Sequence, residues 1–171
     1  MADAAAVTLA KTRIRKSALV LALSAITAAA VSLSSSAHAA EAFSALDGRW
    51  SGSGTASFAG GETEKLRCTA RYSGGNSSLS LSLKCASASA QINLTGSLDA
   101  NGNKVSGDWN ENSFGLSGGA SGSTNGGSVR LRISGGASGY LTLNVSGNRH
   151  TVALSSQGTS LSGVNVSMSR R

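Results

Sequence analysis

Apolar and polar residues alternate along most of the chain after residue 48. Between residues 79 and 83, for example, Leu79, Leu81 and Leu83 are separated by Ser80 and Ser82. A period of two puts alternate side chains on opposite faces of an extended strand, so each such run predicts a β-strand with one apolar face. The pattern predicts strands over residues 49–58, 64–73, 78–86, 90–98, 104–110, 114–120, 128–134, 139–146, 150–156 and 161–169.

Short segments rich in glycine and asparagine separate these runs, among them Gly74-Gly75-Asn76 and Asn101-Gly102-Asn103. They suit tight turns and are too short for the crossover that parallel strands need. We therefore expect an all-β domain, an antiparallel up-and-down meander of about 8–10 strands. Closure into a barrel removes the exposed sheet edges, so we favour it over the alternative, a β-sandwich.

The alternation alone does not say whether the apolar face points into the barrel or out towards lipid, as in an outer-membrane barrel. Against the second arrangement, the predicted strands are shorter than membrane-spanning ones and no aromatic girdles are evident.

The first 47 residues are a different kind of chain, because all 22 glycines lie at or after Gly48. A basic cluster that ends at Lys16 precedes a long uncharged stretch, which ends in Ala37-His38-Ala39. This succession is typical of a secretory signal peptide. We predict a signal peptide over 1–39 that is cleaved after Ala39, a short segment over 40–48 with a helical turn, and one barrel domain over 49–171. The predicted location is the bacterial periplasm or the exterior of the cell.

Removal of this signal lowers the formal net charge from +7 to +4, with 11 Lys and Arg left against 7 Asp and Glu. Residues such as Arg130 and Arg132 alternate with apolar ones, which indicates solvated strand faces. Nucleic-acid interfaces interleave clustered basic residues with aromatic ones, and neither feature is visible here. We expect no nucleic-acid partner and no stable membrane insertion after signal cleavage.

Cys68 and Cys85 are the only cysteines. If they pair across a hairpin, Ala70 faces Leu83, Tyr72 faces Leu81, and the turn is centred on residues 76–77. Both strands then present their apolar residues on the same face, as a real hairpin requires. We predict a structural disulfide between Cys68 and Cys85, formed in an oxidising compartment.

Few residues could support catalysis. His150 is the one histidine left after signal removal, and because it follows a Gly-Asn-Arg turn we expect it to be exposed. The segment 115–119 matches Gly-x-Ser-x-Gly, but no helix follows Ser117, as a nucleophile elbow would need. The carboxylates, among them Asp108 and Glu111, form no pair that their spacing singles out. We therefore expect a protein that is not an enzyme, with no catalytic residues, no metal site and no cofactor.

The segment Asp47-Gly48-Arg49-Trp50-Ser51-Gly52 carries a Gly-x-Trp at the start of the first predicted strand. This arrangement resembles the calycin barrels, such as lipocalins and avidins. The resemblance implies that Trp50 closes the bottom of the barrel, against an arginine for which Arg170 and Arg171 are the candidates. Residues 48–171 also resemble small exported proteins of alphaproteobacteria, a likeness that implies a location but no activity. Some periplasmic metalloprotease inhibitors have a similar small barrel with one disulfide.

These patterns lead to two hypotheses about function. The first is an exported protein that binds a small apolar ligand in the mouth of the barrel, with Trp50, Tyr72 and Trp109 as candidate ligand-binding residues. The competing interpretation is that the same side chains fill the interior and leave no cavity. The second hypothesis is an envelope protein-interaction module or protease inhibitor that acts through residues 40–46 or the hairpin loops. The expected inward-facing set is Trp50, Phe58, Leu66, Tyr72, Leu83, Ile92, Trp109, Leu116, Leu131, Leu143, Leu154 and Val166.

Overall fold

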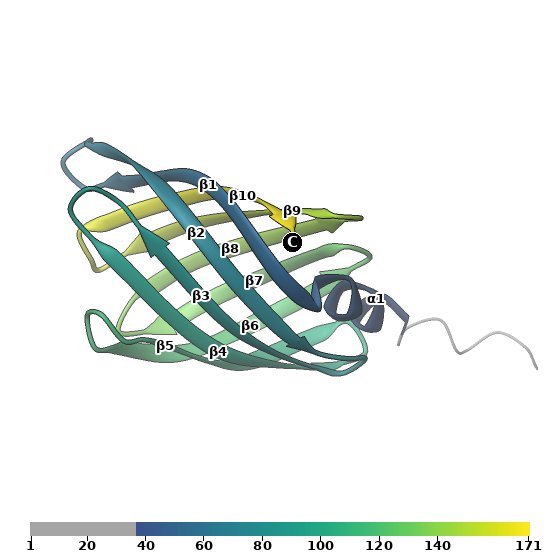
Figure 1. The fold of residues 1–171 in the computed structure, drawn as a ribbon. Helices are drawn as coiled ribbons and strands as arrows, with labels where there is room; N and C mark the ends of the chain where they lie inside the picture. The colour runs from purple at the N-terminus through teal and green to yellow at the C-terminus, as the bar shows by residue number, and fades with distance from the viewer. Residues whose placement is uncertain (1–36) are drawn as a thin grey trace, which may run out of the picture. The chain divides into compact units, whose positions relative to one another are not determined.

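A computed structural model describes residues 37–171, so residues 1–36 of the predicted signal peptide lie outside the described part of the chain. Ten antiparallel strands close into one barrel, in which each strand pairs with the next along the chain and β10 pairs with β1 (Figure 1). The predicted meander and its closure are therefore confirmed, and the barrel rather than the sandwich is formed. The elements are α1 (Ala37–Leu46), β1 (Gly48–Phe58), β2 (Thr63–Gly74), β3 (Ser78–Ala86), β4 (Gln91–Asn101), β5 (Lys104–Glu111), β6 (Leu116–Asn125), β7 (Ser128–Gly135), β8 (Ser138–Ser146), β9 (Arg149–Gln157) and β10 (Leu161–Arg170).

The apolar face of the strands points into the barrel. On β2, for example, Leu66, Cys68 and Ala70 are buried, whereas Arg67 and Thr69 between them are exposed. Buried apolar residues from all parts of the barrel wall and from α1 form one continuous core. The interior is therefore the apolar side, which answers the question that the alternation left open.

The strand boundaries agree with the sequence prediction except at β4 and β6, which run several residues further than expected. For β6, the Ser-Gly composition of the residues after Ala120 is typical of a turn, and the predicted strand ends there. In the structure the ladder to β7 continues, with Gly122 opposite Leu131 and Thr124 opposite Val129. Thr124 is buried at 2% exposure, so a polar residue occupies an inward position there. Pairing with β7 thus extends a segment whose local composition favours a turn.

Glycine lets the barrel wall bend sharply along β1. A Cβ atom added at Gly54 would lie 1.9 Å from the carbonyl oxygen of Asn165 in β10, and one added at Gly52 would lie 1.9 Å from that of Ser167. No side chain fits at such a distance, so the absence of a Cβ lets the paired strand β10 bend close over these positions. These interior glycines are part of the curvature that closes the barrel.

The hairpin of β2 and β3 has the predicted disulfide and the predicted register. Cys68 and Cys85 are bonded across the ladder, with their Cα atoms 4.1 Å apart. Ala70 lies opposite Leu83 and Tyr72 opposite Leu81, and the turn between the strands is centred on residues 76–77. No free cysteine remains in the described residues.

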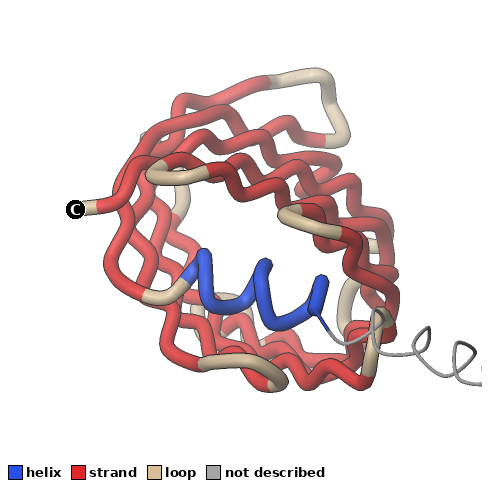
Figure 2. Tube along the Cα trace, turned by 90° about the vertical axis from the view of Figure 1, so that its right-hand side faces the viewer, coloured by secondary structure: helices blue, strands red, loops and turns tan. Residues whose placement is uncertain are grey.

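The helix α1 lies across one end of the barrel (Figure 2). Its Ala42, Phe43 and Leu46 side chains are fully buried, and it contacts β2, β6 and β8. The helical turn predicted within residues 40–48 is therefore present, in a helix that begins before residue 40. The expected cleavage site after Ala39 falls in the first turn of this helix, and cleavage there remains a prediction. Among the described residues, no helix has the length and hydrophobicity needed to cross a membrane.

Candidate functional site

The inner faces of the strands enclose an apolar cavity of about 360 Å³. It extends from Phe43 and Leu46 of α1 to residues of the hairpin turns at the opposite end of the barrel, such as Phe114 and Thr159. Its wall is made almost wholly of aliphatic and aromatic side chains. A cavity of this size lies within the usual range for small-molecule sites, roughly 300–1,000 Å³.

The sequence-predicted inward set describes this wall well. Every member of the set except Trp50 lines the cavity. Of the three candidate ligand-binding residues, Tyr72 and Trp109 are therefore on the wall, whereas Trp50 packs at the end of the barrel under α1. Contact of any of them with a ligand remains a prediction. The wall also includes residues that the sequence analysis did not single out, among them Ala120, Met168 and the two helix residues Phe43 and Leu46.

Trp109 is held in the barrel wall by hydrogen bonds to its indole nitrogen. Its partners on the two neighbouring strands are both glycines, Gly96 and Gly118. The indole Nε1 donates to the carbonyl oxygens of Gly119 and Ser134, at 3.2 Å each. The polar atom of the ring is thus satisfied by the barrel wall, and the half-buried ring can offer apolar surface to the cavity.

Tyr72 is the one tyrosine of the cavity wall, at 5% exposure. Burial raises the pKa of its hydroxyl well above the usual value. The group therefore stays neutral at physiological pH and is able to donate a hydrogen bond. Its ring meets that of His150 edge to face, with 5.4 Å between the centroids.

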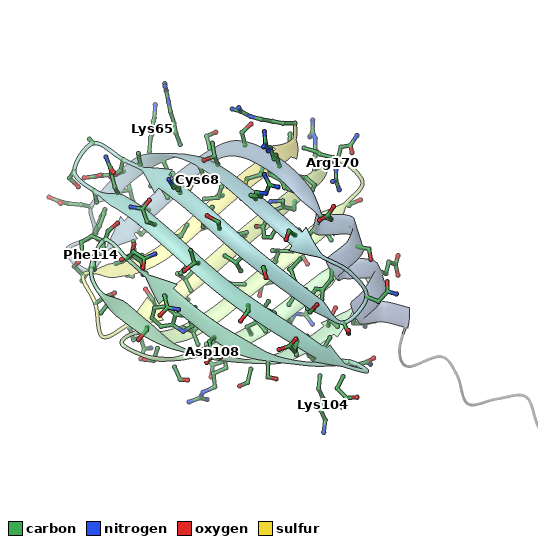
Figure 3. The ribbon with its side chains drawn as sticks, turned by 60° about the horizontal axis from the view of Figure 1, so that its bottom comes forward. Lys65, Cys68, Lys104, Asp108, Phe114 and Arg170 are labelled. Atoms are coloured by element: carbon green, nitrogen blue, oxygen red, sulfur yellow. A yellow bond between two sulfur atoms is a disulfide. The ribbon has the colours of Figure 1, made fainter. Side chains whose placement is uncertain are left out.

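The cavity end opposite α1 is formed by hairpin turns, and Glu111 organises one of them. The buried Glu111 carboxylate accepts the backbone N–H groups of Asn93 at 2.7 Å, Ser113 at 3.1 Å and Phe114 at 2.7 Å. Three such bonds satisfy a buried carboxylate, so its role here is structural. Phe114 in the same turn is 62% exposed and lies at this rim of the barrel (Figure 3). Several hydroxyl groups share the rim, from Ser87, Ser138, Ser156, Thr159 and Ser160.

Trp50 and Arg170 fix the other end by binding the last turn of α1. The Trp50 Nε1 atom donates to the carbonyl oxygen of Leu46 at 2.7 Å. The Arg170 guanidinium donates to the carbonyl oxygens of Ala45, at 2.5 Å, and Asp47, and its Cζ lies 4.5 Å from the centroid of the Trp50 ring. Carbonyl groups at a helix C-terminus lack intrahelical partners, and a positive charge there is favourable. Of the two candidate arginines, Arg170 is thus the one that meets Trp50.

His150 is inside the barrel, so the expectation that it is exposed is wrong. It is 1% exposed, and its ring lies 4.7 Å from that of Trp50, centroid to centroid. Neither ring nitrogen has a hydrogen-bond partner in the described part of the protein. Burial, and secondarily the charge of Arg170, lowers its pKa to about 4, so the imidazole is neutral at physiological pH. The alternation of residues could have indicated this, because His150 lies two and four residues before Val152 and Leu154 and therefore on the same, inward face of the strand.

The described residues contain no group of three or more His, Cys, Asp or Glu side chains arranged to hold a metal ion. The one feature that brings many candidate residues together is the apolar cavity.

No protein-family model matches the chain, and no curated protein matches its sequence. The barrel is similar to a solved structure, the crystal structure of Rv2717c from M. tuberculosis, with a TM-score of 0.60. The two sequences are 14% identical, and the match covers 78% of this chain and 97% of that one. At this level of identity the similarity concerns the fold alone.

Proposed function

We propose that this protein binds a small, largely apolar ligand inside its barrel. The observation that supports the proposal is the apolar cavity of about 360 Å³ that runs from α1 to the opposite rim. A barrel without a ligand could bring larger side chains inward and fill this space, as tightly packed cores do. Instead a small residue, Ala120, stands on the wall of β6 and the cavity remains.

The lining also indicates the chemistry of the ligand. The buried carboxylate of Glu111 is already occupied by three backbone N–H groups, and Tyr72 is neutral. The other carboxylate of the lining, that of Asp108, belongs to an exposed residue. A charged group deep in the cavity would therefore lose its hydration without gaining a counter-ion. The ligand that fits is an apolar chain or ring system whose polar end, if it has one, lies among the hydroxyl groups of the rim.

The same proposal places the protein outside the cytoplasm. The Cys68–Cys85 disulfide is compatible with export, since such bonds persist in oxidising compartments. The contact between Trp50 and Arg170 agrees with what the calycin resemblance implies for the closed end of the barrel. We give less weight to a protease inhibitor that acts through residues 40–46, because Phe43 and Leu46 of that segment are buried against the barrel.

The proposal is tested by filling the cavity with one side chain. Ala120 lines the cavity on β6, and Ala120→Phe would place a benzyl group in the space. Ala153 is exposed on β9, so Ala153→Phe makes the same chemical change on the outside. The probe is the neutral fluorophore N-phenyl-1-naphthylamine, titrated into each protein while its emission is followed. Native mass spectrometry of the purified protein identifies any ligand that is retained.

We expect saturable dye binding by the parent protein and by Ala153→Phe, and at least a tenfold weaker Kd for Ala120→Phe. Circular dichroism and the unfolding midpoint establish whether each variant is folded. If Ala120→Phe does not fold, Leu131→Phe, a smaller addition at another cavity position, replaces it. A parent protein that binds no apolar dye, or equal binding by the cavity and surface variants, would show that the cavity is not the site.

A further inference from the structure

Six exposed cationic side chains form a continuous group on the outer wall of the barrel, which we call the basic face. Five of them lie on β1, β2 and β3, and Arg171 follows β10, which closure of the barrel places beside β1 (Figure 1). None of them is part of the cavity wall. The basic face consists of Arg49, Lys65, Arg67, Arg71, Lys84 and Arg171.

The strand register puts three of these arginines side by side. Arg49 lies directly opposite Arg71 in the ladder between β1 and β2. The backbone N–H of Arg171, just after β10, donates to the carbonyl oxygen of Arg49 at 2.9 Å. Two residues from Arg71 along β2, Thr69 lies opposite Lys84 of β3. Like charges directly opposite one another in a sheet are destabilising, so this arrangement costs stability and calls for a reason outside folding.

The charges are concentrated on this side of the barrel. The five strands from β9 through β10 to β3, with Arg171, contain eight Lys or Arg and one carboxylate, that of Glu64, while Asp47 and Glu62 lie just outside the ends of β1 and β2. Glu64 is engaged at the rim, where its carboxylate accepts hydrogen bonds from the backbone N–H and hydroxyl of Ser89. The other five strands, β4–β8, hold three basic and three acidic residues and are neutral. Figure 3 shows Lys65 of the basic face extending away from the barrel.

The centre of the basic face is slightly hollow. Arg49, Arg71, Lys84 and Arg171 border one depression of about 210 Å³ on the outer wall, and no carboxylate lines it. Thr69 and Ser82 add hydroxyl groups to its floor. A group with several anionic oxygens, such as a phosphate, is the ligand that a depression bordered by four cationic residues and two hydroxyls would suit.

The whole basic face is larger than one phosphate. From Lys65 to Arg71 along β2, six residues at about 3.3 Å each span roughly 20 Å. From β10 to β3, three strand spacings of about 4.8 Å span roughly 14 Å. An area of this size needs an extended anionic partner.

The residues between the cations narrow the choice of partner. The outward positions of β1 and β2 between them are Ser51, Ser53, Thr55 and Thr69. Single-stranded nucleic acids are bound by aromatic side chains that stack on the bases, and none stands among these positions. Protein interfaces depend on buried aromatic and apolar anchors, which this face also lacks. A fluid layer of anionic headgroups needs neither, because its lipids can move to meet the cations of a convex wall.

We propose that the basic face docks the barrel onto a membrane surface that is rich in anionic phospholipids, with one headgroup phosphate seated between Arg49, Arg71, Lys84 and Arg171. The attachment is peripheral and electrostatic, since the face offers nothing apolar to insert. It depends on salt, and each cation at the surface strengthens binding about fivefold. It is independent of whether the cavity holds a ligand.

The test is sedimentation with large unilamellar vesicles of 30% phosphatidylglycerol in phosphatidylcholine, compared with vesicles of phosphatidylcholine alone. The protein is used as it is recovered from a bacterial host, with its N-terminus mapped by mass spectrometry. The face variant is Arg49→Gln with Arg71→Gln. The matched control is Arg130→Gln with Arg132→Gln, which removes the same charge from exposed positions of β7 on the neutral side.

We expect the parent protein to bind the anionic vesicles at low salt, more weakly at 0.5 M NaCl, and the neutral vesicles not at all. Two lost cations should weaken binding roughly 30-fold for the face variant and less than threefold for the control. Equal weakening of both variants would mean that binding depends only on the net charge of the protein, which would overturn the proposal. So would equal binding to neutral vesicles, or binding of a soluble 20-base-pair DNA duplex as tight as that of the vesicles and equally sensitive to the face variant.

Discussion

Arg170 joins the last strand of the barrel to the helix that covers its end, and Arg170→Met tests how much this joint stabilises the fold. Methionine keeps the unbranched stem of the side chain but removes the guanidinium. The substitution thereby deletes both hydrogen bonds to the carbonyl oxygens of Ala45 and Asp47, together with the stacking on Trp50. The neighbouring Arg171 provides the matched control, because its exposed side chain belongs to the outer wall and contacts none of these groups.

The expected size follows from those contacts. A hydrogen bond to a charged group contributes about 1.5–3 kcal/mol, and a cation–π contact about 0.5–2 kcal/mol. Arg170 is half-buried, and water can replace part of the bonding at the exposed carbonyl of Asp47, so the lower ends of these ranges apply. We expect Arg170→Met to lower the free energy of unfolding by about 3 kcal/mol, and Arg171→Met by less than about 0.5 kcal/mol. For a domain of this size the larger value corresponds to roughly 10 °C in Tm.

The measurement is equilibrium unfolding in urea, followed by tryptophan fluorescence and by far-ultraviolet circular dichroism on the same samples. Hydrogen exchange of the α1 amides shows whether the helix opens separately from the barrel, as the loss of its C-terminal partners predicts. Equal unfolding free energies for the two variants, or unchanged exchange of α1 in Arg170→Met, would refute the role assigned to Arg170.

Three further predictions concern the wall and interior of the barrel. Replacing both Cys68 and Cys85 by alanine opens a loop of 17 residues. In the chain-entropy model this should lower the free energy of unfolding, measured in urea, by about 3 kcal/mol. If reductant left the unfolding midpoint of the parent protein unchanged, the prediction would be contradicted. His150 has its pKa lowered to about 4 in the folded protein, so the unfolded chain binds more protons between about pH 6.5 and 4, and stability should fall as the pH falls through that range. His150→Phe should flatten this part of the pH profile in thermal unfolding, and a profile parallel to that of the parent would show that other groups cause it. Gly54→Ala forces a Cβ to within 1.9 Å of a backbone oxygen and should destabilise the protein by about 1–3 kcal/mol or more. Gly60→Ala, with no atom within 4 Å of the added Cβ, should not. Similar Tm values for the two variants would argue against a close approach of β10 at Gly54.

Sequence reasoning predicted the cavity wall better than it predicted the two ends of the barrel. The inward orientation of residues such as Leu83 and Leu131 follows from the alternation alone, because inward and outward positions alternate along a strand. Trp50 lies under α1 and not on the cavity wall. This depends on where the helix packs, which the alternation of residues does not specify. His150 was assigned to the surface because the turn before it dominated the interpretation, although its own parity favoured the interior.

The basic face was missed for a different reason. Its residues are separated in the chain by more than a hundred positions, from Arg49 to Arg171, and no single strand holds enough of them to attract notice. Each cation looked like an ordinary solvated charge on its own strand. The direct pairing of Arg49 with Arg71 depends on the register of the hairpin between β1 and β2. The approach of Arg171 to Arg49 appears only when the last strand meets the first.

The sequence by itself determined the local features of this protein: ten strands of alternating polarity, their turns, and the register of the hairpin between Cys68 and Cys85. These depend on interactions between near neighbours in the chain: a period of two fixes which residues share a face, and the cysteine pair selects the register. Only the tertiary structure decided the direction of the apolar face, the covering of one end by α1, the remaining cavity and the burial of His150. Those depend on how ten strands curve and close, which places residues from opposite ends of the chain side by side.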